Sequence, residues 1–175
     1  HTSSIRSVGV EYKSTPLNNE AMLMIANDTL FNRQTREWYK KSYDNLQKNI
    51  GEYILLTNKP VTIDAINIKS KAPLHIAILT DNSTGSSAEQ FVLDAKQRSK
   101  LKKYRKPTLR SINISNMNST KSPSGKFILR YGTSKSLRIP EYQVDDIGLM
   151  PDVYLDSTIP DYFWVEFAKS KLEKL

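Results

Sequence analysis

The sequence predicts an α/β domain in which a mixed sheet is flanked by helices. Short apolar runs rich in β-branched residues alternate along the chain with segments whose apolar residues recur every three or four positions. The length also fits, because 175 residues suffice for one domain with a sizeable core. We therefore expect a single layered domain over residues 1–175, without an internal repeat.

The first half of the chain predicts, in order, a strand or extended lead-in, two helices and two strands. Loose alternation, helical spacing and β-rich runs place these elements at residues 5–12, 15–26, 34–49, 53–56 and 61–68. Gly51 stands just beyond the second helix, as a glycine that ends a helix would.

The second half predicts a buried central strand that turns into a helix, followed by shorter elements. The central strand and its helix are expected at 76–79 and 86–97, further strands at 127–131, 137–139 and near 153–155, and a last helix from about 159. Residues 106–125 are rich in Asn, Ser and Thr and contain two prolines, which indicates a loop or irregular strands.

The turn between the central strand and its helix has two interpretations. Ser86 and Glu89 have the spacing of a capping box, which would only stabilise the start of the helix. Alternatively, Ser86 is a nucleophile on a strand–turn–helix elbow, where backbone N–H groups at the helix N-terminus can hold an oxyanion. That second role requires a base from elsewhere in the molecule. The turn lacks the glycines and lysine of a phosphate-binding loop.

Composition limits the other functions. The formal net charge of +8 comes largely from a cluster between Lys96 and Lys106, which we interpret as a solvated basic face because no nucleic-acid-binding motif accompanies it. The alternative is that this cluster binds a nucleic acid or an anionic surface. Cysteine is absent and only two histidines occur, so we expect neither a metal nor another cofactor. His75 is interpreted as a strand-edge residue. No apolar run reaches the ~20 residues of a membrane-spanning helix.

Two segments together resemble the carboxyl-terminal-processing (tail-specific) serine peptidases, the family that includes the tricorn core peptidase and the retinoid-binding protein repeats. Residues Ile78–Asp81 and Thr84–Phe91 are similar to that family's strand, turn and S-x-x-E nucleophile helix, and Asp145–Val153 is similar to its late G-[IV]-x-P-D segment. The segments at 108–116 and 133–140 look like linking strands of a branch from the envelope of Bacteroidetes-type bacteria.

The resemblance implies a ClpP/crotonase-like layered fold and a set of site residues. Ser86 would be the nucleophile, and backbone N–H groups around Gly85 and Ser87 would stabilise the oxyanion. Asp145 stands where tricorn-like members have an acidic residue and would orient a base. Ser111 occupies the position of the lysine of Ser–Lys members, so this sequence offers no lysine in register, and tricorn-like members take their histidine from a region that would precede His1.

The resemblance therefore implies the C-terminal portion of a serine peptidase domain, without the family's PDZ and N-terminal parts, that is incomplete or inactive as an isolated chain. The alternative is a catalytically silent relative that binds a peptide or an apolar ligand in the same groove. We expect a peptide or protein substrate, no nucleic acid and a bacterial cell-envelope location, either periplasmic or as a surface lipoprotein. A homo-oligomer is left open.

Overall fold

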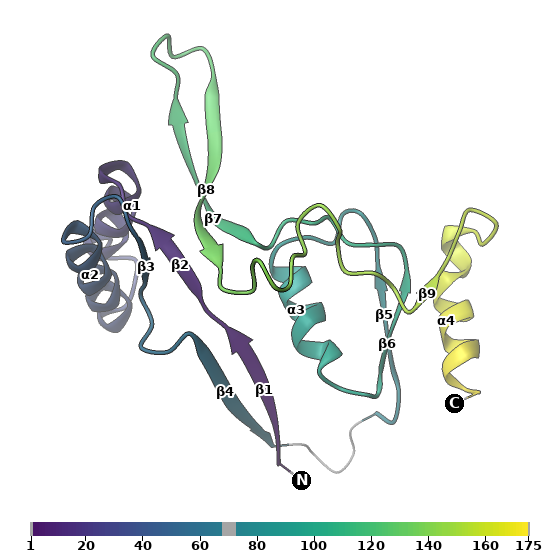
Figure 1. Ribbon diagram of the computed structural model, residues 1–175. Helices are drawn as coiled ribbons and strands as arrows, with labels where there is room; N and C mark the ends of the chain where they lie inside the picture. The colour runs from purple at the N-terminus through teal and green to yellow at the C-terminus, as the bar shows by residue number, and fades with distance from the viewer. Residues whose placement is uncertain (1, 68–72, 175) are drawn as a thin grey trace. The chain divides into compact units, whose positions relative to one another are not determined.

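In the computed structural model the described residues, 2–67 and 73–174, divide between two compact units (Figure 1). The first unit combines residues 2–7, 61–67, 73–113 and 140–174, and the second combines residues 8–60 and 114–139. Each unit is therefore assembled from segments that lie far apart in the sequence.

The first unit is built on a parallel sheet of three strands in the order β5-β6-β9. Strand β5 (Ile76–Thr80) pairs along its length with β6 (Leu101–Arg105), and β6 pairs with the two-residue strand β9 (Val153–Tyr154). Parallel strands require a long crossover connection, which α3 (Ser87–Lys96) supplies between β5 and β6.

Helices cover both faces of this parallel sheet (Figure 1). Side chains alternate along β5, so that Ile78 packs into a cluster with Val92 of α3, whereas Ala77 packs into a second cluster with Ala168 of α4 (Trp164–Leu172). A short 3₁₀ helix, η1 (Asp161–Phe163), precedes α4. The result is a three-layer α/β/α arrangement with β5 and β6 at its centre.

Strands β1 (Thr2–Val8) and β4 (Val61–Asn67) form a separate two-stranded sheet, and β1 is bonded to the end of α3. The side chain of Gln97, which ends α3, accepts from the backbone N–H of Arg6 at 2.8 Å and donates to its carbonyl at 2.9 Å. Gln97 thus satisfies both backbone polar groups of one β1 residue.

The second unit is an antiparallel sheet in the order β3-β2-β8-β7, accompanied by a helical hairpin. Its strands are β2 (Val10–Lys13), β3 (Tyr53–Leu55), β7 (Ile114–Lys121) and β8 (Ile128–Ser136), and its helices are α1 (Pro16–Asn27) and α2 (Arg33–Gln47). The hydroxyl of buried Ser14 donates to the carbonyl of Leu46 at 2.7 Å and joins the sheet to α2.

Most predicted elements are present, and three expectations need correction. Residues 137–139, predicted as a strand, form a turn. Part of the predicted irregular stretch is the regular eight-residue strand β7. Strand β6 was not predicted, because its residues read as part of the basic cluster although Lys103 is buried there. The predicted strand at 61–68 matches β4, and residue 68 lies outside the described residues.

The predicted class, α/β with sheets flanked by helices, is confirmed. Parallel and antiparallel pairing occur in different sheets. The finer ClpP/crotonase-like assignment and the grouping of both units into one catalytic domain stay predictions.

Candidate active site

The candidate site begins where β5 ends. The polar turn after Thr80 satisfies its own backbone groups: the Thr84 hydroxyl accepts from the N–H of Asp81 at 3.1 Å, and the Thr84 N–H donates to the Asp81 carbonyl at 2.9 Å. Asp81 Oδ1 also accepts from the N–H of Ser83 at 2.9 Å. These bonds fix the turn that delivers Ser86 to the start of α3.

Ser86 is exposed and has an unusual backbone conformation, with φ 53° and ψ −116°. These angles match the first central position of a type II′ turn, which favours glycine because a Cβ is strained there. Residues other than glycine persist in such conformations only where surrounding structure enforces them, and they cluster at active sites. Strained serines on strand-to-helix turns are the nucleophile elbows of α/β-hydrolases. The predicted capping box is present, since Glu89 accepts from the Ser86 N–H at 3.1 Å. An ordinary N-cap has extended angles, however, so a cap alone does not explain the backbone conformation of Ser86.

The glycine before Ser86 is required by close packing. A Cβ on Gly85 would lie 2.6 Å from Leu109 Cδ2 and 2.9 Å from Ser111 Oγ, both shorter than any normal contact. The absence of a side chain therefore brings the Ser111 hydroxyl up to the backbone that precedes Ser86. Within the part of the chain that the structure describes, the backbone N–H groups of Gly85 and Ser87 donate to no protein acceptor.

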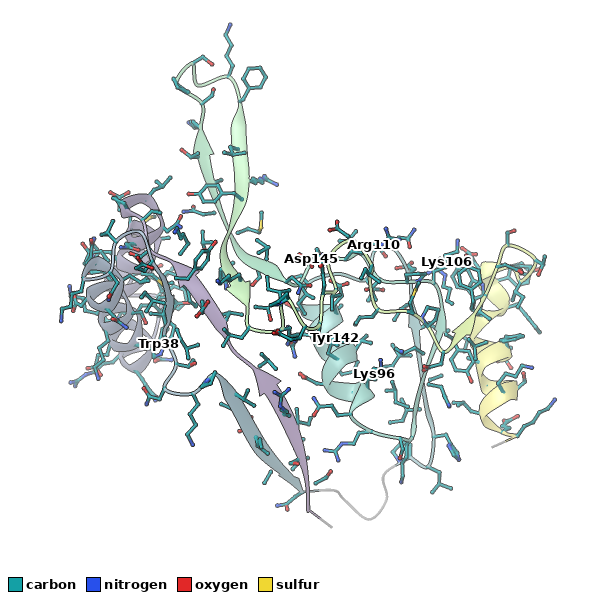
Figure 2. The ribbon with its side chains drawn as sticks, in the orientation of Figure 1. Trp38, Lys96, Lys106, Arg110, Tyr142 and Asp145 are labelled. Carbon is teal, nitrogen blue, oxygen red and sulfur yellow. The ribbon has the colours of Figure 1, made fainter. Side chains whose placement is uncertain are left out.

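Asp145 holds together two loops of the first unit. Its Oδ1 accepts from the backbone N–H groups of Ile112 and Asn113 at 2.7 and 2.8 Å. In return, Asn113 Oδ1 accepts from the N–H groups of Val144 and Asp145, both at 2.7 Å. This exchange ties the segment that contains Ser111 to the segment of the predicted G-[IV]-x-P-D motif. Figure 2 shows Asp145 and Arg110 toward the N-terminal end of α3, with Lys96 at the opposite end.

The aspartate of that motif has a structural partner. Lys103, buried in β6, donates through Nζ to Asp152 Oδ1 at 3.3 Å and to the Met150 carbonyl at 2.8 Å, and its backbone N–H donates to Asp152 Oδ2 at 2.7 Å. Burial raises the pKa of Asp152, but these bonds and the Lys103 charge outweigh it and leave the pKa below its ordinary value. Lys103 is therefore committed to this ion pair and is not a base for Ser86.

No hydrogen bond joins the Ser86 hydroxyl to a lysine or histidine among residues 2–67 and 73–174. His75 lies just before β5, whereas Ser86 follows its far end, and a five-residue strand is roughly 16 Å long. His75 instead lines a cavity of about 610 Å³ with Ala77, Leu79 and residues of α4. Within the same described residues, no group of three or more potential ligands could hold a metal ion.

The structure thus brings Gly85, Ser86, Ser87 and Ser111 to the N-terminal end of α3. It also links Asp145 to the residues that directly follow Ser111. Their chemical roles stay predictions. Sequence reasoning missed Thr108 and Asn113, which lie in the polar stretch after Lys106. The number of hydrogen bonds that Glu89 accepts was also not predicted, because the capping-box spacing accounts only for the bond from Ser86.

Comparison with known proteins gives a structural likeness only. No protein-family model matches the sequence, and no curated protein matches it. Among solved structures, mature CPAF has a TM-score of 0.56 at 12% identity over 97% of this chain and 38% of its own. CPAF complexed with lactacystin has a TM-score of 0.55 at 11% identity over 98% and 37%. A serine-to-alanine variant of CPAF also gives 0.55.

These likenesses show a peptidase-like fold. This chain spans between 36% and 38% of the length of the CPAF chains. A Parabacteroides merdae protein provisionally described as a peptidase gives a TM-score of 0.47 at 15% identity over 67% of this chain and 39% of its own, which is too low to support a shared fold. In the described part of the chain, no helix combines the length and apolar character needed to cross a bilayer.

Proposed function

We propose that this chain is part of a serine peptidase domain in which Ser86 is the nucleophile. The observation that carries the proposal is the strained, exposed backbone of Ser86 at the turn between β5 and α3. The peptidase-like fold supports it independently, because mature CPAF is matched over nearly the whole of this chain.

In the proposed reaction, Ser86 Oγ attacks the carbonyl carbon of a peptide bond and transfers its proton to a base. The N–H groups of Gly85 and Ser87 then donate to the oxyanion, and each such donor contributes on the order of 10²–10³ in rate. Collapse of the tetrahedral intermediate breaks the C–N bond as the base returns the proton to the leaving amine, and it leaves an acyl-enzyme, which water hydrolyses. Ser111, beside Gly85, is proposed to contact the substrate or the oxyanion.

We propose that the base comes from a part of the full-length protein outside the described residues, and that Asp145 helps to orient it. The proposal is motivated by two observations. Ser111 stands where the family has its lysine, and the nearby Lys103 is bound to Asp152. The isolated chain would then be incomplete or inactive.

The second candidate is a silent relative that binds a peptide or apolar ligand without cleaving it. The same observation that motivates an external base favours this candidate, since the described residues supply no lysine or histidine bonded to Ser86. The tail-specific branch, the cell-envelope location and a possible homo-oligomer accompany both candidates as proposals from the resemblance.

A fluorophosphonate probe separates the two candidates, because it reacts with an activated serine. The full-length protein is incubated with the probe beside its Ser86→Ala and Ser87→Ala variants. A peptidase is labelled as wild type and as Ser87→Ala, and loses labelling as Ser86→Ala. No labelling of the folded wild-type protein would favour the silent relative, and equal labelling of Ser86→Ala would contradict the assignment of the nucleophile.

A further inference from the structure

Glu89, on the first turn of α3, is a fully buried carboxylate with four hydrogen-bond donors. Oε2 accepts from the backbone N–H groups of Ser86 at 3.1 Å and Ser111 at 2.9 Å. Oε1 accepts from the backbone N–H of Arg110 at 2.9 Å and from the hydroxyl of Thr108. Each carboxylate oxygen therefore binds two groups.

A helix cap does not require this arrangement. The glutamate of a capping box needs only the N–H of the N-cap residue, which here is Ser86. Burial of a charged carboxylate is costly unless hydrogen bonds compensate it. Three of the four donors belong to residues 108–111, which lie 19 to 22 positions further along the chain. The carboxylate therefore joins that segment to the turn that contains Ser86.

The connection extends to the other segments of the site. Thr108 Oγ1 accepts from the N–H of Leu149, which belongs to the predicted G-[IV]-x-P-D segment, at 2.9 Å. The N–H of Leu109 donates to the carbonyl of Thr84 at 2.8 Å, and the Ser111 hydroxyl packs against Gly85. The spacing between the Ser86 turn and residues 108–111 thus depends on the four bonds to the Glu89 side chain together with the backbone bond between Leu109 and Thr84.

We propose that Glu89 is a positioning residue that holds Ser86 in its strained conformation and sets the Ser111 hydroxyl beside it. The inference rests on the proposed function. Glu89 does not reach the substrate, because it is buried and its oxygens are occupied by protein donors. It acts through the two serines, and its loss displaces them.

The test is the rate of fluorophosphonate labelling of the full-length protein and its Glu89→Gln variant. Glutamine preserves size but places an NH₂ group against N–H donors, so one or more of the four bonds is lost. Labelling is expected to slow by about 10²-fold, the effect of a 1 Å misplacement of reacting groups. The matched control is Asp152→Asn, which weakens a half-buried ion pair of the same unit that does not include Ser86 or Glu89.

Labelling of Glu89→Gln at the wild-type rate would overturn the proposal. A second outcome would also overturn it. If Glu89→Gln and Asp152→Asn are equally destabilised towards urea and their labelling rates fall by the same factor, the role of Glu89 is structural only. If Glu89→Gln fails to fold, Thr108→Val keeps the carboxylate and removes one of its donors, together with the acceptor of the Leu149 N–H. It is expected to slow labelling by roughly tenfold, and wild-type labelling would again overturn the proposal.

Amide hydrogen exchange keeps this test separate from that of the proposed function. In Glu89→Gln, the N–H groups of Ser86, Arg110 and Ser111 are expected to exchange faster while those of β6 are unchanged. That result supports the positioning role even if the wild-type protein is never labelled, in which case the peptidase proposal alone fails. Unchanged exchange at all three N–H groups overturns the positioning role.

Discussion

The strain at Ser86 can be measured with a pair of substitutions at two adjacent positions. Ser86→Ala and Ser86→Gly both remove the hydroxyl and differ only in the Cβ. Ser87→Ala and Ser87→Gly form the matched pair at the first residue of α3. Replacement of alanine by glycine normally lowers the free energy of unfolding at a helical position, by about 0.5–1 kcal/mol.

At position 86 the sign should reverse. A residue with a Cβ held at φ 53° costs about 1–3 kcal/mol, whereas the greater freedom of glycine in the unfolded chain offsets about 0.4–1 kcal/mol. The Ser86→Gly variant should therefore be more stable than Ser86→Ala by about 0.5–2 kcal/mol. For a chain of this size, 1 kcal/mol corresponds to a shift of about 2–4 °C in Tm.

The assay is urea denaturation of the four variants together with hydrogen exchange of the α3 amides, which reports the first unit. The reasoning predicts opposite signs for the alanine-to-glycine difference at positions 86 and 87. If glycine destabilises both positions equally, the Ser86 backbone is not strained, and the observation that carries the proposed function is removed.

Two further predictions concern ion pairs beside the site. Hydrogen bonds from Ser83 and the ion pair with Arg105 outweigh the opposing effect of burial and hold the pKa of Asp81 well below its ordinary value. The stabilisation is therefore complete above about pH 4, near the unfolded-state pKa, and is lost as pH falls further. Urea denaturation should show Asp81→Asn less stable than wild type at pH 7, by a margin that is clearly smaller at pH 2.5; a constant difference would contradict the assignment. Separately, Asp152→Ala should lower the free energy of unfolding by about 1–3 kcal/mol, because Lys103 loses charge-assisted hydrogen bonds. Lys103→Met should restore part of that loss in the Asp152→Ala background, and additive losses in urea would refute the pairing.

The elements with local signals were predictable from the sequence. Apolar periodicity identified both helices of the second unit, and the apolar run 76–79 identified β5. The S-x-x-E spacing located the start of α3 within one residue. Each of these signals depends only on residues that are close together in the sequence.

The long-range contacts were not predictable. Strand β6 reads as basic because the partner that neutralises Lys103 is Asp152, 49 positions further along the chain. The exchange of bonds between Asn113 and Asp145 spans 32 positions and leaves no periodic pattern. The positive φ of Ser86 follows from the contacts around it, whereas the sequence alone admits an ordinary cap.

The most direct measurement of the central claim is the site of covalent modification. The full-length protein is treated with a fluorophosphonate, digested and mapped by tandem mass spectrometry. An adduct is expected on Ser86, and Ser83, Ser87 and Ser111 should stay unmodified. An adduct on one of those three serines, or none on folded protein, would contradict it.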